Sequence, residues 1–179
     1  MDFTRINDQA SQNLGIDGII SMNGRSIKVD VKAQSDYLNR DLPTLAFELA
    51  YQKDGKEHIG WLFDVHKQTD VYHYVSNIKL KENGAALNSP SDINSLDIYH
   101  IDRQTLIKRL EELKVDKASC DGTMGMMRQK HILKSHAAII GTNIIWSQDK
   151  GERPFNLVVT KKALFEMLSP LGFSRIWPV

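Results

Sequence analysis

The sequence is poor in cysteine and in long apolar runs, and both shortages restrict what the protein does. Cys120 is the single cysteine among 179 residues, which excludes a disulfide framework and a cysteine-rich zinc site. The same shortage is typical of a reducing compartment, so we expect a cytoplasmic protein. No apolar run approaches the roughly 18–20 residues of a membrane span. The polar start, MDFTRINDQASQNLG, has no apolar stretch of the kind that a secretory signal carries. We therefore expect no membrane partner.

Two widespread catalytic motifs are also missing. The six histidines never form a His-x-x-x-His or His-Glu-x-x-His pair, which disfavours a zinc hydrolase. The run DGTMG at 121–125 is too short for a phosphate-binding loop and lacks the Lys-Ser ending of one. We expect that run to mark a boundary between elements instead.

The charge is nearly balanced over the chain and unbalanced along it. Hydrophobic residues make up 41% of the sequence and charged residues 25%, enough for one compact domain over 1–179. The formal net charge is +1, but residues 1–102 carry −5 and residues 103–179 carry +6. An acidic metal-site core with a basic part that completes the fold is one explanation, and chance is the other.

The pattern of apolar residues and turns predicts a mixed α/β (α+β) chain. We expect helices at 3–14, 103–114 and 161–168, the last capped by Thr160. We expect strands at 16–22, 26–31, 44–51, 58–63, 70–77 and 156–159, and a long loop at 82–97. The Asn23-Gly24 turn joins the first two strands into a hairpin.

The hairpin carries the most informative side chains of the sequence. Asp17 begins its first strand, and Asp30 and Lys32 share one face of the second strand because side chains alternate. Pairing through the turn brings Asp17 beside Asp30. Two neighbouring carboxylates repel each other unless a hard cation lies between them, and oxygen ligands favour Mg²⁺ or Mn²⁺ over zinc. A lysine at this place is able to position a water or to stabilise charge on a phosphate.

This arrangement resembles the PD-(D/E)XK nuclease superfamily over the first third to half of the chain. The resemblance implies a restriction-endonuclease-like three-layer core, with a central mixed sheet that contains a three-stranded β-meander flanked by helices. It also implies that Asp17, Asp30 and the backbone carbonyl of Val31 bind Mg²⁺ or Mn²⁺, while Lys32 assists the attacking water. An acidic residue of the preceding helix often joins such a site, and Asp8 is the best match.

Gln34 and two departures complete the comparison with this superfamily. Gln34 follows the lysine by two residues on the same face, where it would contact the scissile strand or a metal-bound water. Ile16 stands where the family often has proline, and Asp30 stands where glutamate is commoner. The other explanation of the motif is structural, with Asp30 and Lys32 facing solvent on an edge strand and Asp17 serving a turn.

The basic run MMRQKHILKSH suggests a surface for nucleic acid. On a helix, Lys130 and Lys134 would stack four residues apart, with Arg128 near them, and such a ridge neutralises phosphates. A solvated helix face is the alternative. We expect a Mg²⁺-dependent endonuclease or exonuclease that hydrolyses phosphodiester bonds of nucleic acid, with DNA as the expected substrate. A homodimer is one way to cut two strands. The rival is a catalytically inactive nuclease-fold module for binding or assembly.

Overall fold

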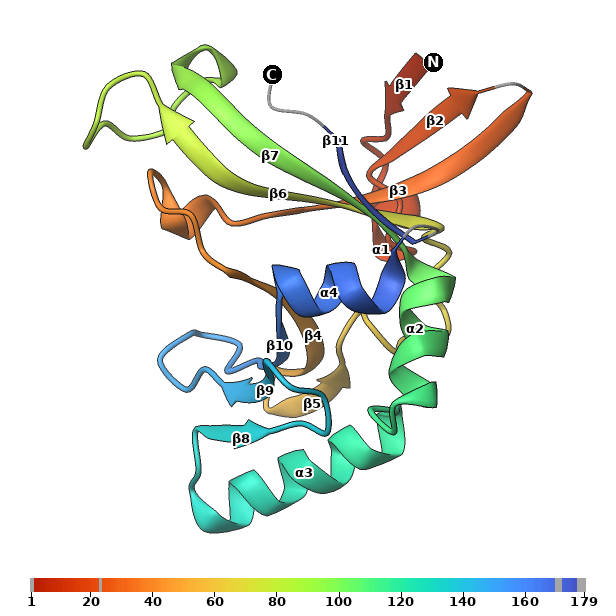
Figure 1. The fold of residues 1–179 in the computed structure, drawn as a ribbon, viewed down its shortest axis with the longest axis vertical. Helices are drawn as coiled ribbons and strands as arrows, with labels where there is room; N and C mark the ends of the chain where they lie inside the picture. Colours follow the sequence, from red (N-terminus) through yellow and green to blue (C-terminus); the bar gives the residue numbers. More distant parts are fainter. Residues whose placement is uncertain (1, 23, 170–171, 177–179) are drawn as a thin grey trace. The chain divides into compact units, whose positions relative to one another are not determined.

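A computed structural model describes the whole chain except residues 1, 23, 170–171 and 177–179 (Figure 1). Within it the chain forms two compact units, each built from separate stretches of sequence. Unit 1 contains residues 1–43, 68–103 and 169–179, and unit 2 contains residues 44–67 and 104–168. The described part is mixed α and β, with two sheets and four α-helices, which confirms the predicted class at this coarse level.

Unit 1 is built on a six-stranded mixed sheet in the order β1-β2-β3-β6-β7-β11. Its strands are β1 (Asp2–Arg5), β2 (Gly18–Met22), β3 (Arg25–Ala33), β6 (Val71–Leu80), β7 (Ile93–Asp102) and β11 (Phe173–Ile176). Neighbouring strands are antiparallel except β3 and β6, which are parallel. A parallel pair needs a long connection between its strands, and here residues 34–70 supply it, most of them in unit 2.

The predicted hairpin is confirmed by the pairing of β2 with β3. Met22 pairs with Arg25, so the turn holds two residues, and Gly24 adopts a left-handed φ of 74° that suits glycine. Asn23, the other turn residue, lies outside the described residues.

The predicted helix over 3–14 is wrong in its first half. Residues 2–5 form β1 and pair with residues 18–21 of β2. The apolar spacing of this segment also suits a helix, but pairing with the edge of β2 makes it a strand. The helix α1 is shorter, Gln9–Asn13, and begins at its N-cap Asp8. The turn after it places Gly15 at a φ of 75°.

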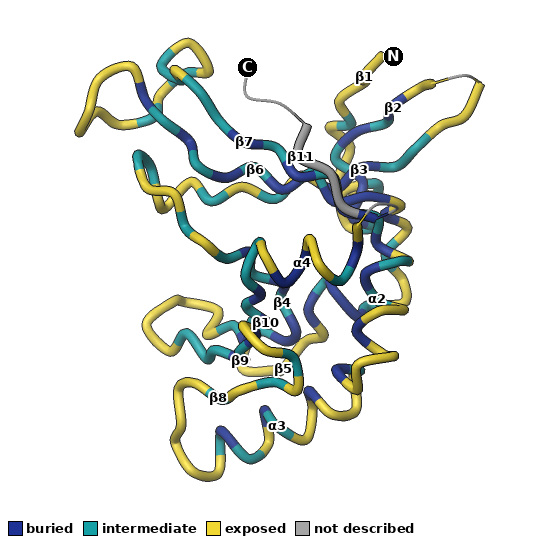
Figure 2. Tube along the Cα trace, viewed as in Figure 1, coloured by how far each residue is buried: buried dark blue, intermediate teal, exposed yellow. Residues whose placement is uncertain are grey.

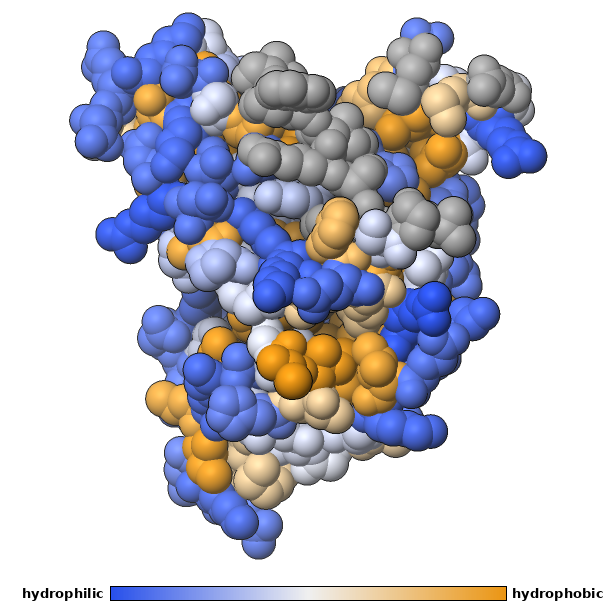
Figure 3. Space-filling view, in the orientation of Figure 1, coloured by the Kyte–Doolittle hydropathy of each residue, from blue (hydrophilic) through white to orange (hydrophobic). Residues whose placement is uncertain are grey.

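The predicted loop at 82–97 is also too long at its end. A 3₁₀ turn at Pro90–Asp92 is capped by Ser89, and β7 begins at Ile93. Strand β7 pairs along β6 from residue 102 back to residue 93, with bulges near Asn77. The remaining connection carries mainly hydrophilic residues, as the space-filling view shows (Figure 3).

Unit 2 is built on a five-stranded antiparallel sheet in the order β5-β4-β10-β9-β8. Its strands are β4 (Thr44–Lys53), β5 (Lys56–Ile59), β8 (Lys134–His136), β9 (Thr142–Trp146) and β10 (Phe155–Thr160). The helices of this unit are α2 (Arg103–Glu112, which begins at the unit boundary), α3 (Lys117–Lys130) and α4 (Lys161–Leu168). None of the helices in the described ranges is long and apolar enough to cross a membrane.

The strand expected at 44–51 does not extend the hairpin into the expected β-meander. The segment 44–53 does not continue the β2–β3 hairpin, because it pairs with β5 and β10 instead, and the strand beside β3 is β6. The strand expected at 58–63 ends at Ile59, and DGTMG lies inside α3 rather than at a boundary. The expected strand at 156–159 and the Thr160 cap are confirmed, since Thr160 Oγ1 accepts a hydrogen bond from the Ala163 N–H at 3.1 Å.

Burial is concentrated on the central strands of both sheets, whereas β1, β5 and β8 are mostly exposed (Figure 2). In unit 1 the fully buried side chains include Val29, Tyr72 and Ile101. In unit 2, Leu45 and Phe47 of β4 and several residues of β10, α2 and α4 are fully buried. The site predicted from the sequence therefore lies on a sheet whose central strands are fixed by packing.

Candidate functional site

Asp17 occupies the point where the β2–β3 ladder ends. The last ladder pair is Gly18 with Val29, and the Asp17 N–H still donates to the Val29 carbonyl at 2.8 Å. Beyond it, Asp17 Oδ2 accepts a hydrogen bond from the Val31 N–H at 2.8 Å. The carboxylate thus takes the place of a strand partner for β3, because a backbone N–H at a sheet edge needs an acceptor.

Asp30 precedes Val31 on β3 and is buried, with 2% of its surface exposed. Its Oδ1 lies 2.8 Å from Nζ of Lys32, whose side chain is 28% exposed. The predicted proximity of Asp30 and Lys32 on one strand face is therefore observed. A buried carboxylate is costly without a partner, and Lys32 supplies a partner that still reaches solvent.

Asp17 acts electrostatically on the buried Asp30. Burial raises the pKa of the Asp30 carboxyl, the Lys32 ammonium opposes that rise, and the charge and hydrogen bonding of Asp17 add to it. Asp17 therefore adds to the cost of ionising Asp30.

The next strands add groups that the sequence did not single out as site residues. Asp30 pairs with Tyr72 of β6. The Tyr72 hydroxyl accepts a hydrogen bond from Nε of the buried Arg103 at 3.0 Å. Burial raises the pKa of Tyr72, Arg103 opposes this, and the Asp30 charge adds to it. The register that sets Tyr72 beside Asp30 depends on a pairing between distant segments, which no local pattern reveals.

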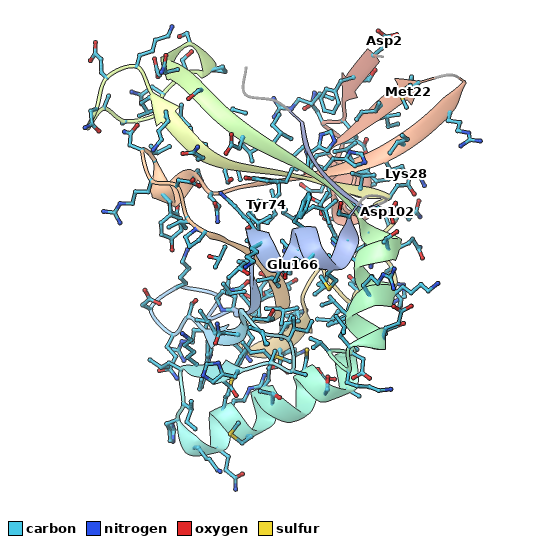
Figure 4. All side chains as sticks on the ribbon, in the orientation of Figure 1. Asp2, Met22, Lys28, Tyr74, Asp102 and Glu166 are labelled. Carbon is cyan, nitrogen blue, oxygen red and sulfur yellow. The ribbon has the colours of Figure 1, made fainter. Side chains whose placement is uncertain are left out.

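The even-numbered residues continue this face along the sheet. Lys32 of β3 pairs with Tyr74 of β6, and Tyr74 pairs with Tyr99 of β7. Both tyrosines are buried. Figure 4 labels Tyr74 among the side chains of β6 and Lys28 on β3. Asp30 and Lys32 are therefore followed on this face by a pair of buried tyrosines.

Asp8 does not join this pair in a three-carboxylate group. Its side chain caps α1 by accepting the Ser11 N–H at 2.8 Å, and that bond lowers the pKa of its carboxyl. Among the residues that the structure describes, no three His, Cys, Asp or Glu side chains form a group able to hold a metal. The loss of the expected third ligand follows from the short α1, since Asp8 precedes the helix rather than lying within it.

Gln34 and Val31 lie at the far end of β3. Gln34 follows the strand, is half-buried, and donates its backbone N–H to the Val75 carbonyl at 2.9 Å. Val31 is 39% exposed and pairs with His73 of β6. The roles predicted for Gln34 and for the Val31 carbonyl stay predictions.

The basic run does not form one helical ridge. Helix α3 ends at Lys130 because His131 adopts a left-handed φ of 51° and donates its N–H to the carbonyls of the last turn. Lys134 then lies in β8, so Lys130 and Lys134 do not stack on consecutive turns. Both lysines are exposed.

Arg128 is held in a different way from the two lysines. It forms an ion pair with Glu57, and its guanidinium lies 4.7 Å from the centre of the Phe155 ring. Trp146 stacks on the same Phe155 at 4.9 Å, which accords with a packing role for this tryptophan. The charge of Arg128 is thus partly neutralised within unit 2.

The polar residues of the segment 64–70 form no metal-binding group of three side chains within the described residues. Asp64 Oδ1 accepts the His66 N–H at 2.9 Å, which is a local turn contact. Asp70 serves β3, where its Oδ2 accepts the Lys28 N–H at 2.8 Å.

A small hard cation suits the donor set of the Asp17–Asp30 pair. Mg²⁺ is usually held by one or two carboxylates and keeps several waters, so it needs no third protein ligand. Asp17 adds to the cost of ionising the buried Asp30, and a cation bound between the two would offset that cost. Comparisons with protein-family models, with curated proteins and with solved structures found no match for this chain.

Proposed function

We propose that the chain is a Mg²⁺-dependent nuclease of the PD-(D/E)XK type that hydrolyses phosphodiester bonds of nucleic acid, with DNA as the expected substrate. The observation that carries the proposal is the grouping of Asp17, Asp30 and Lys32 at one end of the β2–β3 hairpin. Two carboxylates are able to hold a divalent ion, and a lysine that reaches solvent is able to stabilise charge on a phosphate.

Asp17 and Asp30 would hold the metal, with the Val31 carbonyl as a further oxygen ligand. When bound, the ion would polarise the phosphate and lower the pKa of a coordinated water. Lys32 is placed by its contact with Asp30, and from there it orients a water or stabilises the negative charge that builds on the phosphate. Asp17 keeps β3 in position by accepting the Val31 N–H. The mechanism leaves Asp8 out, because its carboxylate caps α1.

The second candidate is a nuclease-fold module that binds or assembles and does not cleave. The capping role of Asp17 favours it, since this carboxylate has a structural function without any metal. The described residues contain no group of three potential metal ligands, which is also consistent with the non-catalytic module. Both candidates use the same fold, and they differ in whether a cation is bound at Asp30.

Cleavage by conservative variants separates the two candidates. The full chain is incubated with linear and nicked DNA and with RNA, in Mg²⁺, in Mn²⁺ and in EDTA. We expect cleavage only with the divalent ion. Asp30→Asn and Lys32→Met should each lower the rate by about 100-fold or more, because each removes a group that stabilises the transition state.

Two exposed residues provide matched controls, Asp149→Asn for the aspartate and Lys108→Met for the lysine. Both controls should cleave at the parental rate. A parent that cuts no substrate and whose melting temperature does not rise in millimolar Mn²⁺ would decide for the non-catalytic module. Cleavage by Asp30→Asn at the parental rate would refute the site itself.

A further inference from the structure

Two histidines face each other across β6 and β7 in unit 1. His73 and His100 are direct partners in the antiparallel register, and Nε2 of His73 lies 3.2 Å from Nδ1 of His100. Their ring centres are 5.4 Å apart and the rings are tilted by 56°. Neither residue belongs to the motif at Asp17 and Asp30.

The pair lies on the sheet face opposite to Asp30 and Lys32. Side chains alternate along a strand, so the pairing of Asp30 with Tyr72 puts His73 on the other face, next to Val31. Val31 is 39% exposed, and His73 and His100 are both half-buried. This face is therefore the more open of the two, since Asp30, Tyr72 and Tyr74 on the other face are all buried.

The separation of the two nitrogens suits a shared transition-metal ion. Imidazole nitrogen binds Zn²⁺ at about 2.0–2.1 Å. With the two nitrogens 3.2 Å apart, the N–Zn–N angle at a shared ion would be about 100–106°, near the tetrahedral value of about 109°. Imidazole is also a ligand for Ni²⁺ and Cu²⁺, whereas Mg²⁺ prefers oxygen.

The protonation and the surroundings of the pair agree with this chemistry. Burial, together with the neighbouring His100, lowers the pKa of His73 to about 4. Burial lowers the pKa of His100 as well, and the negative charge of Asp102 opposes that shift. At neutral pH both rings are uncharged and have a lone pair to donate. Asp102 adds a negative charge near His100, which favours a cation.

We propose that His73 and His100 form a two-histidine site for a divalent transition-metal ion such as Zn²⁺ or Ni²⁺, with solvent completing its coordination. The site joins β6 to β7 and is independent of the carboxylate pair and of the proposed nuclease activity. The competing explanation of the 3.2 Å separation is an N–H···N hydrogen bond between the two rings, which needs no metal.

The test is a binding measurement on the full chain after removal of metal with a chelator. Isothermal titration with Ni²⁺ and Zn²⁺ should show one ion per chain, and Ni²⁺ at about 100 µM should raise the melting temperature. His73→Gln and His100→Gln should each weaken binding by roughly tenfold or more, since each removes one of two nitrogen ligands. His66→Gln, which alters an exposed loop histidine, should bind as the parent does.

Two further measurements keep the test decisive. Asp30→Asn should retain the Ni²⁺ site, which separates this proposal from the carboxylate site. In the parent, Ni²⁺ should broaden the ring NMR signals of His73 and His100 before those of the other histidines, and this needs no variant that must fold. No stoichiometric binding by the parent, binding that survives both glutamine variants, or broadening that begins at other histidines would overturn the proposal and leave the hydrogen-bonded pair.

Discussion

Asp17 has a structural role that depends on its side-chain oxygen and not on its negative charge. Its Oδ2 accepts the Val31 N–H at the end of the β2–β3 ladder. An asparagine keeps an acceptor oxygen at that place, and an alanine does not. The two substitutions therefore separate the fold from the charge at this position.

We expect Asp17→Ala to lower the free energy of unfolding by about 0.5–1.5 kcal/mol, because the exposed Val31 N–H exchanges a hydrogen bond for water. Asp17→Asn should remain close to the parent in stability and should lose divalent-dependent stabilisation. Urea unfolding with and without Mn²⁺ measures both effects. Equal stability of the two variants would show that the hydrogen bond contributes nothing.

Asp30 illustrates the cost of burying a charged group. The raised pKa of its carboxyl means that the folded state favours the protonated form, a contribution that is present below the ordinary pKa near 3.8 and lost as the pH rises through the folded pKa. At pH 7 the ionised group therefore opposes folding. Asp30→Asn should melt at or above the temperature of the parent at pH 7 without metal, while Asp149→Asn should not change it. A fall of several degrees in Asp30→Asn would contradict the electrostatic argument.

Cys120 is expected to be inert in the native protein. It is 2% exposed, and burial raises the pKa of its thiol to about 11. The thiolate fraction at pH 8 is therefore about 10⁻³, and the thiolate is the reactive form. Iodoacetamide at pH 8 should modify the native chain far more slowly than the urea-unfolded chain, as intact-mass measurement will show. Comparable rates would mean that α3 opens readily.

At the scale of elements, two glycines of unit 2 should respond to the same substitution in opposite directions. A Cβ at Gly60 would lie 2.4 Å from the backbone carbonyl oxygen of Glu48 in β4, so the backbone itself must move. A Cβ at Gly122, inside α3, would meet nothing within 4 Å.

We expect Gly60→Ala to destabilise the chain by about 1–3 kcal/mol, by overpacking. Gly122→Ala should stabilise it by about 0.5–1 kcal/mol, because alanine is the better helix former. Urea unfolding of the two variants in parallel checks the pair, and a change of the same sign in both would contradict the packing described here.

The elements predicted correctly are those with local signals. The hairpin rests on its two-residue turn, and α4 rests on its cap at Thr160 and its apolar stripe. The failures are nonlocal. Residues 2–5 became a strand because β2 offered an edge, and residues 44–53 joined β10 from a distant part of the chain. Within the site, Asp30 and Lys32 were found from strand alternation, whereas Tyr72 and Arg103 depend on the parallel pairing of β3 with β6.

At the scale of the whole molecule, the division into units changes the charge pattern. Acidic residues of the segment 44–67 belong to unit 2, so unit 1 carries a formal charge of −2 and unit 2 carries +3. The contrast between −5 and +6 along the sequence is therefore weaker between the units. A phosphate-binding surface on unit 2 would depend on particular lysines more than on net charge.

The salt dependence of DNA binding tests whether Lys130 and Lys134 contact phosphates. Each phosphate contact contributes about 0.9 to the slope of log K against log salt. The double variant Lys130→Ala/Lys134→Ala should lower the magnitude of that slope by about 1.8, and Lys108→Ala/Lys114→Ala should leave it unchanged. Fluorescence anisotropy at several salt concentrations measures the slopes. The same slope in both double variants would place the phosphate contacts elsewhere.

The bond from Val31 to Asp17 also bears on how this chain would diverge. Lys32 is the ion-pair partner of the buried Asp30, so replacing the lysine alone would leave a buried charge unpaired. Position 17 is under a second constraint, because the end of the sheet needs an oxygen acceptor there. Homologues without the proposed activity should therefore change Asp30 and Lys32 together and keep aspartate or asparagine at 17. An acidic residue at position 17 would, by itself, be weak evidence that a homologue has the proposed activity.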